Sequence, residues 1–110
     1  MKYRVHLSGY AHNDIMALYE YIAANSSPRR ADSVLSGIEG LYEVLAEFPM
    51  QGHFPPELYG HQSGDVRELR FKPYRIVYRI DVSRVVVLAV FDGRRDAQSL
   101  ISERVLRSYK

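Results

Sequence analysis

The sequence predicts an α+β protein in which an antiparallel four-stranded sheet carries an N-terminal helical hairpin on one face and a short C-terminal helix. Near the N-terminus, two segments have apolar residues at helical spacing. Three short runs rich in β-branched and aromatic residues follow, separated by two-residue turns, and a last helical stripe closes the chain. The resulting order is β-α-α-β-β-β-α, which segregates helices from strands as α+β folds do.

The first segment predicts a strand that leads into a helix. Tyr3, Val5 and Leu7 alternate with polar residues, so one side of this strand faces solvent. From about Tyr10 to Ala24 the apolar residues recur every three or four positions, which predicts an amphipathic helix.

A second helix follows after a short break. A serine followed by Pro28 is a common way to start a helix, and Pro49 helps to end it. Because the connection is so short, we expect the two helices to form an antiparallel hairpin that lies on the sheet. The apolar stripe of the second helix comprises Ala31, Val34, Leu35, Ile38, Leu41, Tyr42 and Leu45.

A long irregular segment from Phe48 to Asp65 separates the helices from the later strands, and loops of this length are usually functional or mobile. The three strands that follow span about residues 66–71, 74–81 and 84–91. The last is apolar on both sides, so we expect it to be central, with strand order 1-4-3-2. Asp96 can cap the final helix, and the whole chain, residues 1–110, is predicted to form a single domain.

Composition excludes several classes of protein. The chain has no cysteine, its histidines lack metal-ligand spacing, and no apolar run is long enough to cross a bilayer, so we expect no metal, no membrane contact and a cytoplasmic location. Charge is unevenly distributed: residues 1–64 carry 4 Lys/Arg against 7 Asp/Glu, and residues 65–110 carry 11 against 6. The basic C-terminal part predicts an anionic partner, whereas ordinary pairing between the two parts is the alternative interpretation.

The arginines of the C-terminal part gather on one predicted face. In the second of the three strands, Arg75 and Arg79 lie on the side opposite to Tyr74 and Tyr78, and Arg94-Arg95 follows the last strand. Arginine suits an anionic surface because its planar guanidinium matches carboxylate and phosphate oxygens. Alternatively, Arg75 and Arg79 merely coat the solvent face of the sheet. Arg67 has the parity of inward-facing residues, so we expect it to form a buried ion pair with a helix carboxylate.

Several motifs carry a resemblance that covers nearly the whole chain. They are the helical pair, Pro49-x-x-Gly52, Asp65-Val-Arg-Glu-Leu69, Tyr74-Arg-Ile-Val-Tyr78 and Gly93-Arg-Arg-Asp96. In this order and spacing, the chain resembles the RelE/ParE family of toxins from bacterial type II toxin–antitoxin pairs. The resemblance implies the same arrangement of strands and helices.

The resemblance leaves two activities to choose between. RelE-like members cut messenger RNA on the ribosome, whereas ParE-like members lack the nuclease and poison DNA gyrase. Arg75 and Arg95 match arginines of the nuclease site, but its other residues are missing. The chain has Val66 and Glu68 where the nucleases carry lysines, Ile101 where they carry a tyrosine, and Asp92 where others carry a histidine.

The sequence therefore predicts a toxin of the ParE-like branch that inhibits DNA gyrase by binding, without a cofactor and without catalytic turnover. Its target-binding residues are predicted to be Arg75, Arg79, Arg94 and Arg95, and its cognate antitoxin is expected to neutralise it in a hetero-oligomer. One alternative is a ribosome-dependent mRNA endonuclease, with Arg75 and Arg95 stabilising the phosphate and the base at His53, His61, Glu68 or Asp92. A family member that binds antitoxin but has lost toxicity is a third possibility.

Overall fold

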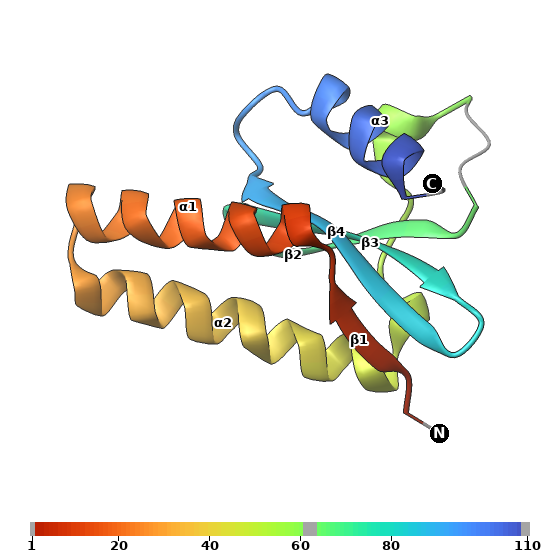
Figure 1. Ribbon diagram of the computed structural model, residues 1–110, viewed down its shortest axis with the longest axis horizontal. Coiled ribbons are helices and arrows are strands. Elements are labelled where there is room, and N and C mark those ends of the chain that lie inside the picture. Colours follow the sequence, from red (N-terminus) through yellow and green to blue (C-terminus); the bar gives the residue numbers. More distant parts are fainter. Residues whose placement is uncertain (1, 61–63, 109–110) are drawn as a thin grey trace.

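The computed structural model describes residues 2–60 and 64–108, and it confirms the predicted order of elements (Figure 1). The strands are β1 (Arg4–Leu7), β2 (Val66–Phe71), β3 (Tyr74–Asp81) and β4 (Arg84–Asp92). The helices are α1 (Gly9–Asn25), α2 (Pro28–Glu47) and α3 (Gln98–Arg107), with two 3₁₀ turns, η1 (Pro49–Gln51) and η2 (Pro56–Leu58). Within the described residues, no helix is both long and apolar enough to cross a membrane.

The sheet has the predicted strand order, β1-β4-β3-β2, but it is mixed rather than wholly antiparallel. β1 runs parallel to β4, whereas the other two pairs are antiparallel. The helical hairpin accounts for this difference, because α2 returns the chain to the start of β1, where Tyr3 N donates to Ala46 O (2.8 Å). β2 therefore runs in the direction of β1, and β4 regains that direction after two hairpin turns.

Both helices of the hairpin begin after a serine; the serine before Pro28 was predicted, whereas Ser8 was not, since the first helix was expected to start at about Tyr10. Ser8 caps α1 by accepting a hydrogen bond from Ala11 N (3.1 Å), and Ser27 caps α2 by accepting one from Arg30 N (3.1 Å). The final helix starts slightly later than predicted. Asp96 accepts a hydrogen bond from Gln98 N (3.2 Å), but Ala97 occupies the N-cap position.

The helical hairpin and α3 lie on opposite faces of the sheet (Figure 1), and an apolar cluster fills the space on each face. On one face, the helical hairpin packs against side chains such as Ile76, Tyr78 and Val87. On the other, α3 and the η2 turn pack against Val77, Leu88 and their neighbours. β4 is central and buried on both faces, as predicted, because it contributes side chains to both clusters.

β4 departs from simple alternation at one point. The register with β3 shifts at Val77/Tyr78, where Val77 pairs with Ala89 and Tyr78 pairs with Val87. Leu88 is therefore an extra residue, and both Leu88 and Ala89 join the cluster on the α3 face. A β-bulge of this kind re-aims the side chains that follow it.

The long segment after α2 is ordered by the sheet beneath it. The buried hydroxyl of Tyr78 donates to Pro49 O (2.6 Å) and accepts from Gly52 N (3.0 Å). Burial raises the pKa of Tyr78, so this hydroxyl stays protonated and can donate. Gly52 has no room for a side chain, since an added Cβ would lie 2.6 Å from Glu68 O. Pro49-x-x-Gly52 thus holds the start of the loop against β3 through the Tyr78 hydroxyl.

Candidate functional site

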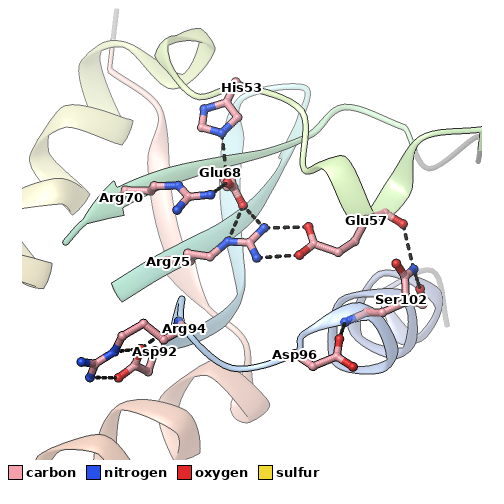
Figure 2. A network of polar contacts seen from close by, with 10 residues as sticks. His53, Glu57, Glu68, Arg70, Arg75, Asp92, Arg94, Asp96 and Ser102 are labelled. Carbon is pink, nitrogen blue, oxygen red and sulfur yellow. Dashed lines mark hydrogen bonds and ion pairs between the residues drawn. The ribbon is translucent and has the colours of Figure 1, made fainter. Parts of the chain in front are cut away.

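Arg75 lies at the centre of a buried ionic network rather than on a bare arginine face (Figure 2). Its Nε donates to Glu68 Oε2 (2.8 Å), and its two terminal nitrogens donate to the two Glu57 carboxylate oxygens (2.6 and 2.7 Å). The Arg75 side chain is 5% exposed and that of Glu68 is fully buried. The structure thus places Arg75 among carboxylates of its own chain, and its role as a target-binding residue stays a prediction.

The hairpin register explains why Glu68 is held in this network. Arg70 and Arg75 are directly opposite one another on β2 and β3, and two like charges in such a pair repel. Glu68 lies on the same face and relieves the repulsion, because Arg70 Nη2 also donates to its Oε1 (3.2 Å). One carboxylate thus bridges two arginines.

Two aromatic side chains complete the surroundings of the network. His53 Nε2 lies 2.9 Å from Glu68 Oε1, and the imidazole itself is mostly exposed (Figure 2). The Arg75 guanidinium lies over the Phe91 ring, 5.2 Å from its centroid. Among the nuclease-base candidates, His53 is therefore oriented by a carboxylate and open to solvent, whereas Glu68 is sealed. His61 lies outside the described residues.

The electrostatics keep this network charged. The hydrogen bonds from Arg75 hold the pKa of Glu57 below its ordinary value, although partial burial opposes the shift. The same bonds to Glu57 raise the pKa of Arg75, with a further contribution from Glu68. Glu57 belongs to η2, and Gln98 of α3 donates to its carbonyl oxygen (2.8 Å). Arg75 therefore ties the long loop and, through it, α3 to the sheet.

The other arginines of β2 and β3 also have partners. Arg67 contacts a loop rather than a helix carboxylate: its Nε donates to Asp65 Oδ1 (2.8 Å), and its Nη1 donates to Met50 O (2.9 Å) and Gly52 O (3.0 Å). Arg79 is mostly buried, and its Nη2 donates to Ser108 O (3.2 Å) beyond the end of α3. Both residues fasten connecting segments to the sheet.

Arg94 and Arg95 remain on the surface. Arg94 is 77% exposed and pairs with Asp92 at 2.6 Å, which lowers the pKa of that carboxyl (Figure 2). The Arg95 side chain is exposed, and it makes no hydrogen bond or ion pair with any other residue that the structure describes. Of the four predicted target-binding residues, the structure thus brings only this adjacent pair together at the surface.

The positions that a RelE-like nuclease would use are filled differently here. Val66 and Ile101 are fully buried in the apolar cluster beneath α3, and Glu68 and Asp92 are each bonded to arginines. In the part of the chain that the structure describes, no three His, Asp or Glu residues could hold a metal ion. The site is therefore built of arginine–carboxylate contacts and aromatic rings.

A contact that no sequence pattern indicated joins the first helix of the chain to the last. Arg104 of α3 makes a two-pronged contact with Asp14 of α1 (2.8 and 2.9 Å) and also donates to Leu88 O (2.9 Å). Asp14 in turn accepts from Val90 N (3.0 Å). No local pattern could have indicated it, since Asp14 and Arg104 are 90 residues apart.

Comparison with protein families gives one match over most of the chain. The family described as "ParE toxin of type II toxin-antitoxin system, parDE" matches residues 5–97. Toxin ParE3 of Caulobacter vibrioides is 24% identical over 91 residues, which cover 83% of this chain and 87% of that toxin.

Solved structures show the same fold. A chain of the chromosomal ParDE toxin–antitoxin system of P. aeruginosa has a TM-score of 0.67 at 18% identity, covering 83% of this chain and 96% of that one. A chain of the RelBE2 complex of Mycobacterium tuberculosis has a TM-score of 0.56 at 26% identity, covering 84% and 92%. A free mutant of E. coli RelE has a TM-score of 0.59 at 21% identity, covering 97% and 98%.

Proposed function

Because this chain belongs to the ParE toxin family of type II toxin–antitoxin systems, we propose that it inhibits DNA gyrase by binding and that its cognate antitoxin neutralises it in a hetero-oligomer. It would act as one domain over residues 1–110. Its site of action would be the cytoplasm, where both gyrase and the antitoxin are found. The family match over residues 5–97 is the observation that carries this proposal.

The filling of the nuclease positions supports binding rather than RNA cleavage. A nuclease needs a proton acceptor, a proton donor and free cations for the developing phosphate charge. Val66 and Ile101 supply apolar side chains to the core, and both guanidinium edges of Arg75 are occupied by Glu57 and Glu68. Of the two arginines that match the nuclease site, only Arg95 has a side chain without a hydrogen-bond or ion-pair partner among the described residues, so it can contact a phosphate.

The surface that best fits a target contact is centred on Arg94 and Arg95. These side chains are exposed, adjacent and cationic, and they lie at the end of the buried β4 strand, which holds their backbone in place. Arg94 N donates to Asp92 Oδ1 (2.9 Å) and Arg95 N donates to Asp92 O (3.2 Å). A fixed backbone lowers the entropy lost when the two side chains engage a partner.

The test compares the two targets directly. Purified toxin is added to gyrase in a supercoiling assay and to ribosomes translating a defined message, with antitoxin-bound toxin as the control. We expect loss of supercoiling or accumulation of cleaved DNA, and an intact message. Codon-dependent cleavage of the message with gyrase unaffected would instead favour the endonuclease, with His53 as its base because Glu68 orients this exposed imidazole.

Harmless expression of the wild-type chain in a host with a sensitive gyrase would favour the third possibility, a non-toxic member that still binds antitoxin. Co-purification with the antitoxin then distinguishes this outcome from a protein that has no toxin–antitoxin role.

A further inference from the structure

Exposed cations from two separate segments meet at the end of the sheet where β4 finishes. Gly93 N donates to Pro73 O (2.7 Å), so the β2–β3 turn lies against the start of the β4–α3 connection. Lys72 precedes Pro73, and Arg94 and Arg95 follow Gly93. The Lys72, Arg94 and Arg95 side chains are all exposed, so they lie at the same end of the molecular surface.

The helical hairpin brings a further cation to this end. Gly37 of α2 packs against the Phe71 ring at the end of β2, with no room for a Cβ between them. Arg30 is seven residues before Gly37, so it lies on the same side of α2 and about 10 Å further along the helix axis. The hairpin thus extends past the end of the sheet, as Figure 1 shows, and the exposed Arg30 lies on that extension. We call this region the cationic end, and its members are Arg30, Lys72, Arg94 and Arg95.

Most of the positive charge at the cationic end is not neutralised by the chain itself. The side chains of Arg30, Lys72 and Arg95 form no hydrogen bond or ion pair with any other residue that the structure describes. Arg94 is paired with Asp92, so it adds nothing to the surplus. Three exposed cations therefore remain without an acidic partner.

The acidic residues that are near in sequence are directed elsewhere. Asp96 follows Arg95, but its carboxylate accepts from Gln98 N (3.2 Å) and lies beside α3, well away from Arg94 in Figure 2. Asp32 of α2 accepts from the Tyr19 hydroxyl (2.6 Å). These carboxylates therefore have contacts that keep them from the three unpaired cations.

The cationic end offers little apolar surface to a protein partner. Tyr21 is 67% exposed and lines a cleft with Arg94 and Arg95. Among the described residues, the other exposed large apolar side chains lie elsewhere, such as Phe48 and Met50 after α2. A protein interface needs an apolar core within its polar rim, whereas a nucleic acid backbone needs separated and solvated cations. The cationic end therefore fits a polyanion better than it fits an acidic protein.

We propose that the cationic end binds the phosphate backbone of DNA. Arg30, Lys72 and Arg95 contact phosphate oxygens, and the Tyr21 hydroxyl can donate to another phosphate. Such contacts depend on charge rather than on base sequence. The biological role of this site rests on the proposed function, because a toxin bound to DNA gyrase lies beside the DNA on which gyrase acts.

The site has a consequence for the order of binding. Three phosphate contacts give weak, salt-dependent binding to DNA alone, with a Kd on the order of 10⁻⁴ to 10⁻⁶ M. Once the toxin is held on gyrase, the same contacts form within one complex, where the effective concentration of DNA is about millimolar. The toxin would therefore bind the gyrase–DNA complex more tightly than it binds gyrase without DNA.

The test measures binding of the full-length toxin to a short labelled DNA duplex by fluorescence anisotropy, over a series of salt concentrations. The variants are Lys72→Glu and Arg95→Glu, one from each segment that meets at the cationic end. Arg4→Glu is the matched control, because Arg4 is exposed, has no side-chain partner among the described residues and lies beside Arg84 at the opposite end of β4. Circular dichroism and the thermal midpoint verify that each variant is folded.

We expect Lys72→Glu and Arg95→Glu each to weaken binding at least fivefold at low salt. Each should also reduce the slope of log Kd against log salt concentration by about one, since one phosphate contact is lost. Arg4→Glu should bind within about twofold of wild type. Equal weakening by Arg4→Glu would show that DNA responds only to net charge, and it would overturn the site. Tighter binding of a single-stranded RNA of the same length would overturn the assignment to DNA.

Supercoiling assays on the same proteins separate this inference from the proposed function. If the wild-type toxin inhibits gyrase but does not bind the duplex even at low salt, the DNA site is wrong and the gyrase proposal stands. If it binds the duplex through the cationic end but leaves gyrase active, the gyrase proposal fails and the DNA site stands as a property of the toxin alone.

Discussion

Arg75 and Arg94 are the same residue type, both bonded to carboxylates, yet they belong to different kinds of site. The Arg75 side chain is 5% exposed and contacts two glutamates, Glu57 from the loop and Glu68 from the sheet. The Arg94 side chain is 77% exposed and pairs with Asp92, two positions away. The first contact joins segments that are distant in the sequence, and the second joins residues of one turn. The comparison shows that an arginine becomes available to a partner only where nothing of its own chain covers it.

The energetics of the two sites differ for the same reason. Glu68 has no access to water, so removing its cation would leave a buried charge without compensation. Asp92 and Arg94 are both open to solvent, so water and salt can replace their contact at little cost. We expect substitutions in the buried network to change stability and substitutions at the exposed pair to change function.

The largest effect is expected for Arg75→Ala, which should lower the free energy of unfolding by about 3–5 kcal/mol because Glu68 stays buried without its main partner. Denaturation in urea, followed by circular dichroism, measures this change. Toxicity should be lost as well, as a consequence of unfolding.

A double substitution provides the control. Arg75→Met combined with Glu68→Met replaces the pair by apolar side chains and should recover part of the stability, because the fully buried Glu68 charge is removed and only Glu57, which has partial access to water, loses its partner. A folded Arg75→Ala protein of wild-type stability would contradict the interpretation that this network stabilises the fold by joining the loop to the sheet.

The contrast between the two sites also separates what sequence could predict from what it could not. Alternation in β3 correctly placed Arg75 with Val77 on one face, and the two-residue turn between β2 and β3 fixes a register that sets Glu68 beside Arg75. This neighbour could have been found. Glu57 could not, because it comes from the long loop, 18 residues away, for which no periodicity applies.

For the same reason, the sequence did not indicate that β1 runs parallel to β4 or that the long loop covers Arg75. Both depend on how the helical hairpin and the loop return the chain to the sheet, and the apolar stripes show only which sides of the helices are buried. The bulge at Leu88 was also hidden, because a strand that is apolar on both sides has no alternation for an extra residue to interrupt.

A smaller effect on stability is expected at Gly93, which lies between the buried network of Arg75 and the exposed Asp92–Arg94 pair. An added Cβ would lie 2.8 Å from Pro73 O and 2.9 Å from Arg75 Cγ, so either the backbone or the arginine must shift. Gly93→Ala should therefore lower the free energy of unfolding by about 1–3 kcal/mol in urea denaturation.

Gly40 of α2 is the matched control for this substitution, because nothing lies within 4 Å of a Cβ added there. Gly40→Ala should raise stability by about 0.5–1 kcal/mol, as alanine favours a helix. Equal effects at Gly93 and Gly40 would mean that Gly93 does not need to be so close to Arg75.

Glu57→Gln is expected to cost about 1–2 kcal/mol at pH 7, because it weakens a charge-assisted contact with Arg75 that is only partly open to water. The pKa of Glu57 is lowered in the folded protein from its ordinary value of 4.5. Its contribution is therefore complete above about pH 4.5 and is lost as the pH falls through the lower, folded-state pKa. The difference between wild type and Glu57→Gln should shrink in that acidic range.

Asp92→Asn provides the comparison at the exposed site, since Arg94 likewise lowers the pKa of Asp92. Any acid-dependent contribution of Asp92 should fade in about 0.5 M salt, whereas that of Glu57 should persist, because solvent screens the exposed pair more strongly. Urea denaturation between pH 3 and pH 7, with and without salt, measures both. Equal salt sensitivity would remove the distinction between the two sites.

The smallest effect on stability, with the largest on function, is expected for Arg94→Ala combined with Arg95→Ala. Both side chains are exposed, and that of Arg95 has no hydrogen-bond or ion-pair partner among the described residues, so the free energy of unfolding should stay close to that of wild type. Growth arrest on expression without antitoxin should nevertheless be abolished, because the cations proposed to contact the target are gone. Arg84→Ala is the matched control and should remain toxic. A double variant that keeps both its stability and its toxicity would place the target contact elsewhere on the molecule.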